Sequence, residues 1–256
     1  MKILAICGSP KKGNCYSVLN SIQENFPTID YKLLMLNEVN LEKCRGCYVC
    51  IARGEEFCPL KDDRELKDDR DMIIQEISDA DGIILASPVH VNHISALMKQ
   101  FIDRLGFLAH RPRFFNKYVM VMAIGGGFGA DKANEYMSGM FSVFGLNVVS
   151  SLELYIATKA ERDNPYNHKM TTNAVNTLID GIKKGQGNPP APTMLKLIYF
   201  NIFKAISELN KKEGLADYEF YKDKTDYVYD TKINPFKKMM AKRIAGKEIA
   251  KMMKNR

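Results

Sequence analysis

The feature that most constrains the fold of this chain is an alternation of short apolar runs with amphipathic segments over its first 184 residues. Segment 94–105, between two of these runs, has apolar residues at helical spacing. Some of the runs are apolar throughout, which is typical of strands covered by helices on both faces. The alternation predicts an α/β fold with a doubly wound, five-stranded parallel sheet. The predicted strands are 2–6, 31–36, 82–86, 118–124 and 147–156.

Residues 185–192 interrupt this alternation with Gly and Pro, and we predict a linker there. It would join a domain at 1–184 to a mostly helical extension at 193–256. Residues 191–256 carry 15 Lys and Arg against 8 Asp and Glu, so the chain's net charge of +7 lies in this part. We interpret its basic helix, 237–254, as an arm that packs on a neighbouring copy. Contact with an anionic membrane surface is the less favoured alternative, and one basic helix does not indicate nucleic-acid binding.

Composition places the chain among ordinary globular proteins, with 46% hydrophobic and 26% charged residues. No apolar run reaches the roughly 18 residues of a membrane-spanning helix. The first apolar run is too short for a signal peptide and lacks a small-residue cleavage site. We therefore expect a cytoplasmic protein.

The first predicted strand runs directly into a small polar loop that carries two lysines. Because a helix is predicted to begin near Cys15, backbone N–H groups and the positive end of the helix favour an anion here. The spacing matches neither the Walker pattern nor the dinucleotide fingerprint. An ordinary polar turn with Asn14 as the helix N-cap is the alternative. The candidate anion-binding residues are Ser9, Lys11, Lys12, Gly13, Asn14 and Cys15.

Two further loops are predicted at the same edge of the sheet. With strand order 2-1-3-4-5, they meet the first loop at the switch point where ligands bind. A flat ligand can lie close to the bare backbone of the glycines after the fourth strand. The two histidines are an alternative metal pair, although no third ligand is evident nearby. The candidates are Ser87, Pro88, Val89, His90, Val91, Asn92 and His93 after the third strand, and Gly125, Gly126 and Gly127 after the fourth.

Four of the six cysteines lie within 15 residues: Cys44, Cys47, Cys50 and Cys58. Three thiolates from one tight turn fit an iron–sulfur cluster. A zinc site and plain reduced thiols stay open as interpretations, although zinc usually takes two separated cysteine pairs. A stable disulfide is disfavoured in the cytoplasm.

Loop 8–14, segment 87–104 and the glycines 125–127 together resemble the flavodoxin-like NAD(P)H-dependent FMN reductase superfamily. The cysteine run is similar to that of the iron–sulfur flavoprotein branch, with a longer last spacing than in its best-known cluster-bearing members. The resemblance implies FMN, with its phosphate on loop 9–15 and its ring against residues 87–93 and 125–127. It also implies a 4Fe-4S cluster on the four cysteines.

The resemblance further implies an oxidoreductase that takes electrons from NAD(P)H or ferredoxin and assembles as a homodimer or homotetramer. A flavodoxin-like electron carrier without substrate turnover is the alternative, and a flavin-binding redox sensor is a third class. The flavin would do the electron chemistry, so no side chain is nominated as a catalytic acid or base. The acceptor, a small molecule or a protein, is not indicated by these residues.

Overall fold

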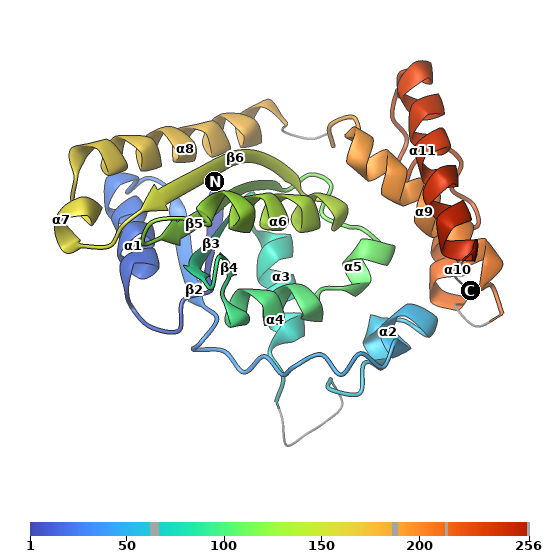
Figure 1. Cartoon of the computed structure of the whole chain (residues 1–256), viewed down its shortest axis with the longest axis horizontal. Coiled ribbons are helices and arrows are strands. Elements are labelled where there is room, and N and C mark those ends of the chain that lie inside the picture. The colour runs from blue at the N-terminus through green and yellow to red at the C-terminus, as the bar shows by residue number, and fades with distance from the viewer. Residues whose placement is uncertain (62–66, 186–188, 213–214, 255–256) are drawn as a thin grey trace.

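The computed structural model describes residues 1–61, 67–185, 189–212 and 215–254 (Figure 1). Its centre is a parallel sheet in the order β2-β1-β3-β5-β6, as predicted. A short strand that was not predicted, β4, pairs antiparallel with the end of β3. The strands are β1 (Lys2–Cys7), β2 (Asp30–Met35), β3 (Gly82–His90), β4 (His93–Ile94), β5 (Tyr118–Gly125) and β6 (Asn147–Tyr155).

Helices cover both faces of the sheet, which confirms the doubly wound α/β prediction (Figure 1). Ile3 and Ala5 of β1 point into one apolar layer, and Leu4 and Ile6 point into the other. This alternation is the period of two of a strand buried on both faces. The first layer lies under α1 (Asn14–Asn25) and α8 (Pro165–Lys184), which α7 (Lys159–Arg162) precedes. The second lies under α3 (Arg70–Asp79), α4 (Ala96–Arg104), α5 (Phe107–His110) and α6 (Ala130–Val143).

The third strand is longer than predicted, because residues 87–90 continue it instead of forming a loop. Val91 and Asn92 follow with φ of 48° and 64°, and the chain returns as β4. Two consecutive residues with positive φ form the tight turn that suits a two-residue hairpin. Ser87 and Pro88 were predicted to lie in a loop after the strand, but both belong to the strand.

A long connection between β2 and α3 contains the cysteine segment. It includes one turn of helix, α2 (Val49–Ala52), and a short 3-10 turn, η1 (Glu55–Phe57). Gly46 and Tyr48 have φ of 62° and 58°, and Tyr48 is the N-cap of α2. Residues 41–48, which include Cys44 and Cys47, have no regular secondary structure.

The C-terminal part consists of α9 (Met194–Leu209), α10 (Leu215–Tyr221) and α11 (Pro235–Lys254). These helices form a small apolar core of their own around Leu197, Phe200 and Tyr221. Of the predicted linker, residues 186–188 lie outside the described residues, and 189–192 have no regular secondary structure. No described helix has both the length and the apolarity to cross a membrane.

The basic helix α11 packs on α9 of the same chain, with Ala241 and Ala245 buried at the contact. Phe236 and Met253, near the two ends of this helix, are 67% and 50% exposed. An intrachain contact therefore covers part of the helix that the sequence analysis assigned to a neighbouring copy. The oligomerisation arm stays a prediction.

Candidate functional site

The loop after β1 leaves the positive end of α1 open. Among the described residues, no side chain caps α1 and no acidic residue occupies its first turn. Ser9 Oγ and the Gly13 N–H both donate to the Lys11 carbonyl, at 2.7 and 2.8 Å, which curls the loop on itself. The uncapped N–H groups and the helix dipole therefore face outward, where they favour an anion.

Asn14 does not cap the helix, contrary to the alternative interpretation of this loop. The N-cap is Gly13, and the Asn14 side chain donates instead to the Ile156 carbonyl, at 3.0 Å. The amide reaches away from its own helix because the end of β6 lies beside the loop. This bond ties the loop to the neighbouring chain segment.

A cavity of about 220 Å³ opens where the ends of β1, β3 and β5 meet. Its walls come from the three segments that the sequence placed at one edge of the sheet. Pro10, Ile124 and Ile156 complete the lining and were not predicted. The predicted site residues that line it are Ser9, Lys11, Gly13, Asn14, Cys15, Pro88, Val89, His90, Gly125 and Gly126.

The Cys15 thiol at this cavity is buried. Burial raises its pKa well above the ordinary value, and the nearby Cys7 thiol raises it further. The group is therefore a neutral thiol at neutral pH and places no negative charge beside a bound anion.

The remaining predicted site residues lie outside the cavity lining. Lys12 forms an ion pair with Glu38, at 3.3 Å, so its charge is already engaged. The His93 ring packs edge-on against Tyr136, with 4.8 Å between ring centroids. Val91 lies fully exposed at the hairpin tip. Ser87, Asn92 and Gly127 also line no part of this cavity.

Ser95, which the sequence analysis did not select, joins two walls of the site. Its hydroxyl donates to the Gly8 carbonyl at 2.6 Å and accepts the Met98 N–H at 3.1 Å as the N-cap of α4. Its own N–H donates to Ser87 Oγ at 3.0 Å. All of these bonds are buried, so they hold the first loop and the hairpin in fixed relation. A serine just before an apolar helical run is an N-cap signal that was available in the sequence.

All four clustered cysteines line a second cavity, of about 200 Å³. Cys44 and Cys47 are exposed, whereas Cys50 and Cys58 are half-buried. Burial raises the pKa of the Cys50 thiol, the Cys58 and Cys44 thiols raise it further, and Arg111 opposes the shift. Burial therefore disfavours the thiolate form of Cys50.

Four thiols line this cavity together with one carboxylate residue, Asp103, which pairs with Lys99. Thiolates are the ligands that iron–sulfur clusters take. The sulfur atoms do not yet converge. In the described part of the chain, no three His, Cys, Asp or Glu side chains are arranged to hold a metal ion, and this includes the His90 and His93 pair. The thiols would have to move closer together to hold a cluster.

Two buried arginines form the inner wall of the cysteine cavity. Arg104 makes a two-pronged ion pair with Asp68, at 2.5 and 2.7 Å, and both side chains are 2% exposed. Arg70 donates to the Glu55 carbonyl at 2.9 Å. These bonds tie the long connection to α3 and α4 and thereby shape the cavity.

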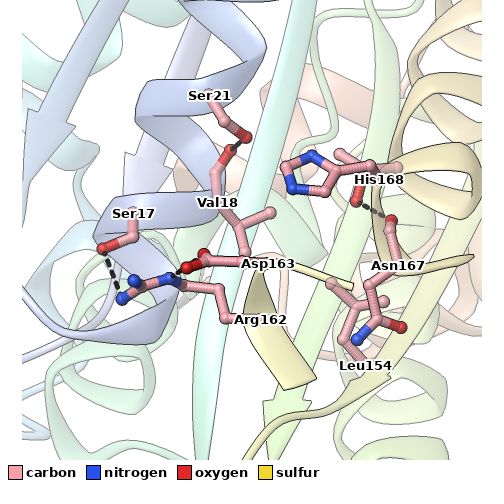
Figure 2. Close-up of a pocket in the computed structure, with 9 residues that line it drawn as sticks. Ser17, Val18, Ser21, Leu154, Arg162, Asp163, Asn167 and His168 are labelled. Carbon is pink, nitrogen blue, oxygen red and sulfur yellow. Dashed lines mark hydrogen bonds and ion pairs between the residues drawn. The ribbon is translucent and has the colours of Figure 1, made fainter. Parts of the chain in front are cut away.

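Figure 2 shows a third cavity, of about 40 Å³, between α1 and the α7–α8 segment. Arg162 spans it, pairing with Asp163 at 2.9 Å and donating to Ser17 Oγ at 3.4 Å, while the His168 ring points across from α8. None of the predicted site residues lines it. Its contacts brace the outer side of α1, whose N-terminus forms the anion loop.

The fold and the first cavity define a flavodoxin-like α/β protein with a ligand site at the switch point of its sheet. Residues 1–161 match the family model described as NADPH-dependent FMN reductase, and the chain belongs to this family.

Curated relatives place the chain in the iron–sulfur flavoprotein branch. A protein named iron–sulfur flavoprotein from Archaeoglobus fulgidus is 30% identical over 150 residues, covering 57% of this chain and 64% of the relative. One of the same name from Methanosarcina thermophila is 30% identical over 156 residues, covering 58% of this chain and 77% of the relative. The match thus spans less than two thirds of the first relative's length.

Solved structures agree on the fold. The structure of RosB with a bound 8-demethyl-8-formylriboflavin-5'-phosphate intermediate aligns over 92% of both chains with a TM-score of 0.59 and 13% identity. At this identity the likeness shows the fold alone. It extends over most of the chain and not only over its first part.

Proposed function

We propose that this protein binds FMN in the cavity at the ends of β1, β3 and β5. As an FMN-dependent oxidoreductase, it would pass electrons from NAD(P)H or ferredoxin to a small-molecule or protein acceptor. The observation that carries the proposal is the meeting of an uncapped helix N-terminus with bare glycine backbone in one cavity of a chain of this family. FMN supplies hydride and single-electron chemistry when bound.

The chain's own part is to bind and orient. The phosphate would be held by N–H groups at the start of α1 and by the Lys11 ammonium group, which lines the cavity. Lys12 would contribute less, because Glu38 already engages it. A Cβ built on Gly126 meets no described atom within 4 Å, which leaves room for a ring to lie against this backbone. Pro88, Val89 and His90 would form the opposite wall.

We also propose that Cys44, Cys47, Cys50 and Cys58 hold an iron–sulfur cluster. Their shared cavity and the branch to which the chain belongs support this. A cluster takes one electron at a time, so the protein would convert two-electron into one-electron transfers.

The first test is to purify the protein without oxygen and to measure iron, acid-labile sulfide and FMN per chain. About four irons for each FMN supports both proposals. FMN without iron would leave the four cysteines as thiols and refute only the cluster. A protein that binds no FMN, even when FMN is added, would refute the flavin site.

A second test separates the two lysines of the anion loop. Removing both charges in a Lys11→Ala, Lys12→Ala double variant should weaken FMN binding about tenfold or more, roughly 1.4 kcal/mol. Lys11→Ala alone should account for most of this loss, and Lys12→Ala is the matched control. Unchanged affinity in the double variant contradicts the phosphate assignment.

Turnover distinguishes the oxidoreductase from an electron carrier. Steady-state oxidation of NAD(P)H with free flavin, a quinone or oxygen as acceptor supports the former. Stoichiometric reduction by ferredoxin, with no oxidation of NAD(P)H, would instead make the protein a carrier.

A further inference from the structure

One buried arginine connects the cysteine loop to the C-terminal part of the chain. Arg111 follows α5, and its side chain is 6% exposed. Its guanidinium group donates to the Cys50 carbonyl and, at 3.4 Å, to the Ile51 carbonyl. It also pairs with Glu55 at 2.9 Å. Arg111 thereby holds the backbone of α2 at Cys50 and Ile51 and the Glu55 side chain of η1, ahead of the fourth cysteine.

The same guanidinium group forms an ion pair with Asp217 of α10, whose side chain is 7% exposed. The other oxygen of this carboxylate lies 2.6 Å from Nδ1 of His110. The His110 ring in turn packs on Phe203 of α9, with 4.3 Å between ring centroids. In Figure 1, α10 lies beside α2, although more than 160 residues separate them in sequence.

Charge balance explains why Asp217 matters to the loop. Two guanidinium groups, Arg111 and Arg113, meet two carboxylates, Glu55 and Asp217. Without Asp217, Glu55 would have to balance both arginines, one of which is almost fully buried. A buried charge that loses its partner is strongly destabilised and draws its surroundings out of place.

We infer that Asp217 is a positioning residue for the cysteine cavity. It fixes the Arg111 side chain, and Arg111 fixes the backbone that carries Cys50 and leads to Cys58. The C-terminal part of the chain is then a component of the thiol site and not only an appendage. Where this inference concerns a bound cluster, it rests on the proposed function.

The test is alkylation of each cysteine in the full-length chain, reduced and stripped of iron, with iodoacetamide and mass spectrometry. Asp217→Asn keeps the shape of the side chain and removes its charge. Cys50 and Cys58, which are half-buried, should react about tenfold faster than in the wild type, a change equivalent to roughly 1.4 kcal/mol. Cys7 in β1 and Cys15 at the start of α1 are buried away from this loop and should keep their rates.

Glu219→Gln is the matched control. It removes an exposed ion pair between α10 and Lys222, the residue after this helix, at 2.5 Å, and should change none of the rates. Unchanged rates at Cys50 and Cys58 in a folded Asp217→Asn variant would overturn the inference. An equal rise at all six cysteines would also overturn it, because that marks general destabilisation. If the Asn variant does not fold, Asp217→Glu decides by the same two criteria.

Reconstitution with iron and sulfide adds a second readout. Asp217→Asn should retain half or less of the iron that the wild type binds per FMN, with FMN itself unchanged. If the wild type takes up no iron, the proposed cluster fails, and the alkylation contrast still decides the role of Asp217.

Discussion

The two cavities have almost the same volume, about 220 Å³ at the sheet edge and about 200 Å³ at the cysteine loop, but they are built differently. The first is lined by glycines and by polar and apolar side chains at the ends of three neighbouring strands, without a buried ion pair among the described lining residues. The second is lined by thiols and by the buried Arg70 and Arg104. Hydrogen bonds between adjacent elements shape the first, and buried ion pairs between distant segments shape the second.

This difference indicates how each site should fail. The sheet-edge cavity depends on close packing, so added volume should disturb it and loss of a surface charge should not disturb its shape. The cysteine cavity depends on buried charges, whose partners cannot be removed singly without a large penalty. Four substitutions can break or sharpen this contrast.

The largest effect is expected from Asp68→Asn, which leaves Arg104 buried without its carboxylate. We expect the free energy of unfolding to fall by about 3–5 kcal/mol, measured by urea denaturation at neutral pH. Asp103→Asn is the control on the same partner helix, because it removes only an exposed pair with Lys99. A loss below about 1 kcal/mol in Asp68→Asn would show that the cavity does not depend on this ion pair.

Gly8→Ala should be the most damaging small change at the sheet-edge cavity. A Cβ there would lie 2.9 Å from Met98 Cβ and from Ser95 Oγ, where neither atom can move freely. We expect a loss of about 1–3 kcal/mol in thermal or urea unfolding, together with weaker FMN binding. Gly139→Ala, on α6 with no described atom within 4 Å, is the control and should be neutral or slightly stabilising. If Gly8→Ala changes the free energy of unfolding no more than Gly139→Ala does, the close packing around Gly8 is contradicted.

Lys196 tests whether the C-terminal part is also held by a buried charge. Its ammonium group donates to the Gly145 carbonyl at 2.8 Å and to Asn147 Oδ1 at 2.7 Å, and burial lowers its pKa from 10.5 to about 8. Between these two values the unfolded chain holds this proton more tightly than the folded protein. The free energy of unfolding should therefore rise with pH between about 8 and 10.5. Below pH 8 the ammonium group stays charged in the folded protein, and the full cost of burying this charge remains.

From pH 8 to 9.5 the gain should be about 1–2 kcal/mol, since one pKa unit corresponds to roughly 1.4 kcal/mol. The measurement is urea unfolding across this range for the wild type and for Lys196→Met. The difference between their unfolding free energies at each pH gives the contribution of Lys196 alone, because the cysteines and tyrosines that also titrate at high pH are present in both proteins. If the unfolding free energies of the two proteins change with pH in parallel, the two hydrogen bonds of the ammonium group offset the cost of its burial.

The smallest effect on folding is expected from Gly126→Ala. The added methyl group meets no described atom, so the free energy of unfolding should change by less than about 0.5 kcal/mol. FMN affinity, measured by fluorescence titration, should nevertheless fall about tenfold, because the methyl group would occupy space assigned to the ring. Unchanged FMN affinity would contradict the proposed position of the flavin ring against Gly126.

Much of the fold was determined by the sequence itself. Continuous apolar runs such as 118–124 and the helical spacing of 94–105 predicted a doubly wound sheet, because burial on two faces imposes those patterns on the residues. These patterns do not determine the strand order, but the order taken for this class of fold agrees with the observed one. The loops at the ends of β1, β3 and β5 were predicted to meet on the basis of that order. The hairpin at 87–94 was missed, since Val91 at positive φ carries no turn signal in the sequence.

Only the tertiary structure decided which residues reach the cavities and what holds them. Lys11 and Lys12 are adjacent and alike in sequence, yet Glu38 engages only one of them. Asp217 and Arg111 lie 106 positions apart, and no local pattern links them. Hydrophobic periodicity acts over a few neighbouring residues, whereas the pairing of buried charges depends on how whole elements pack, and so it appears only when the chain is folded.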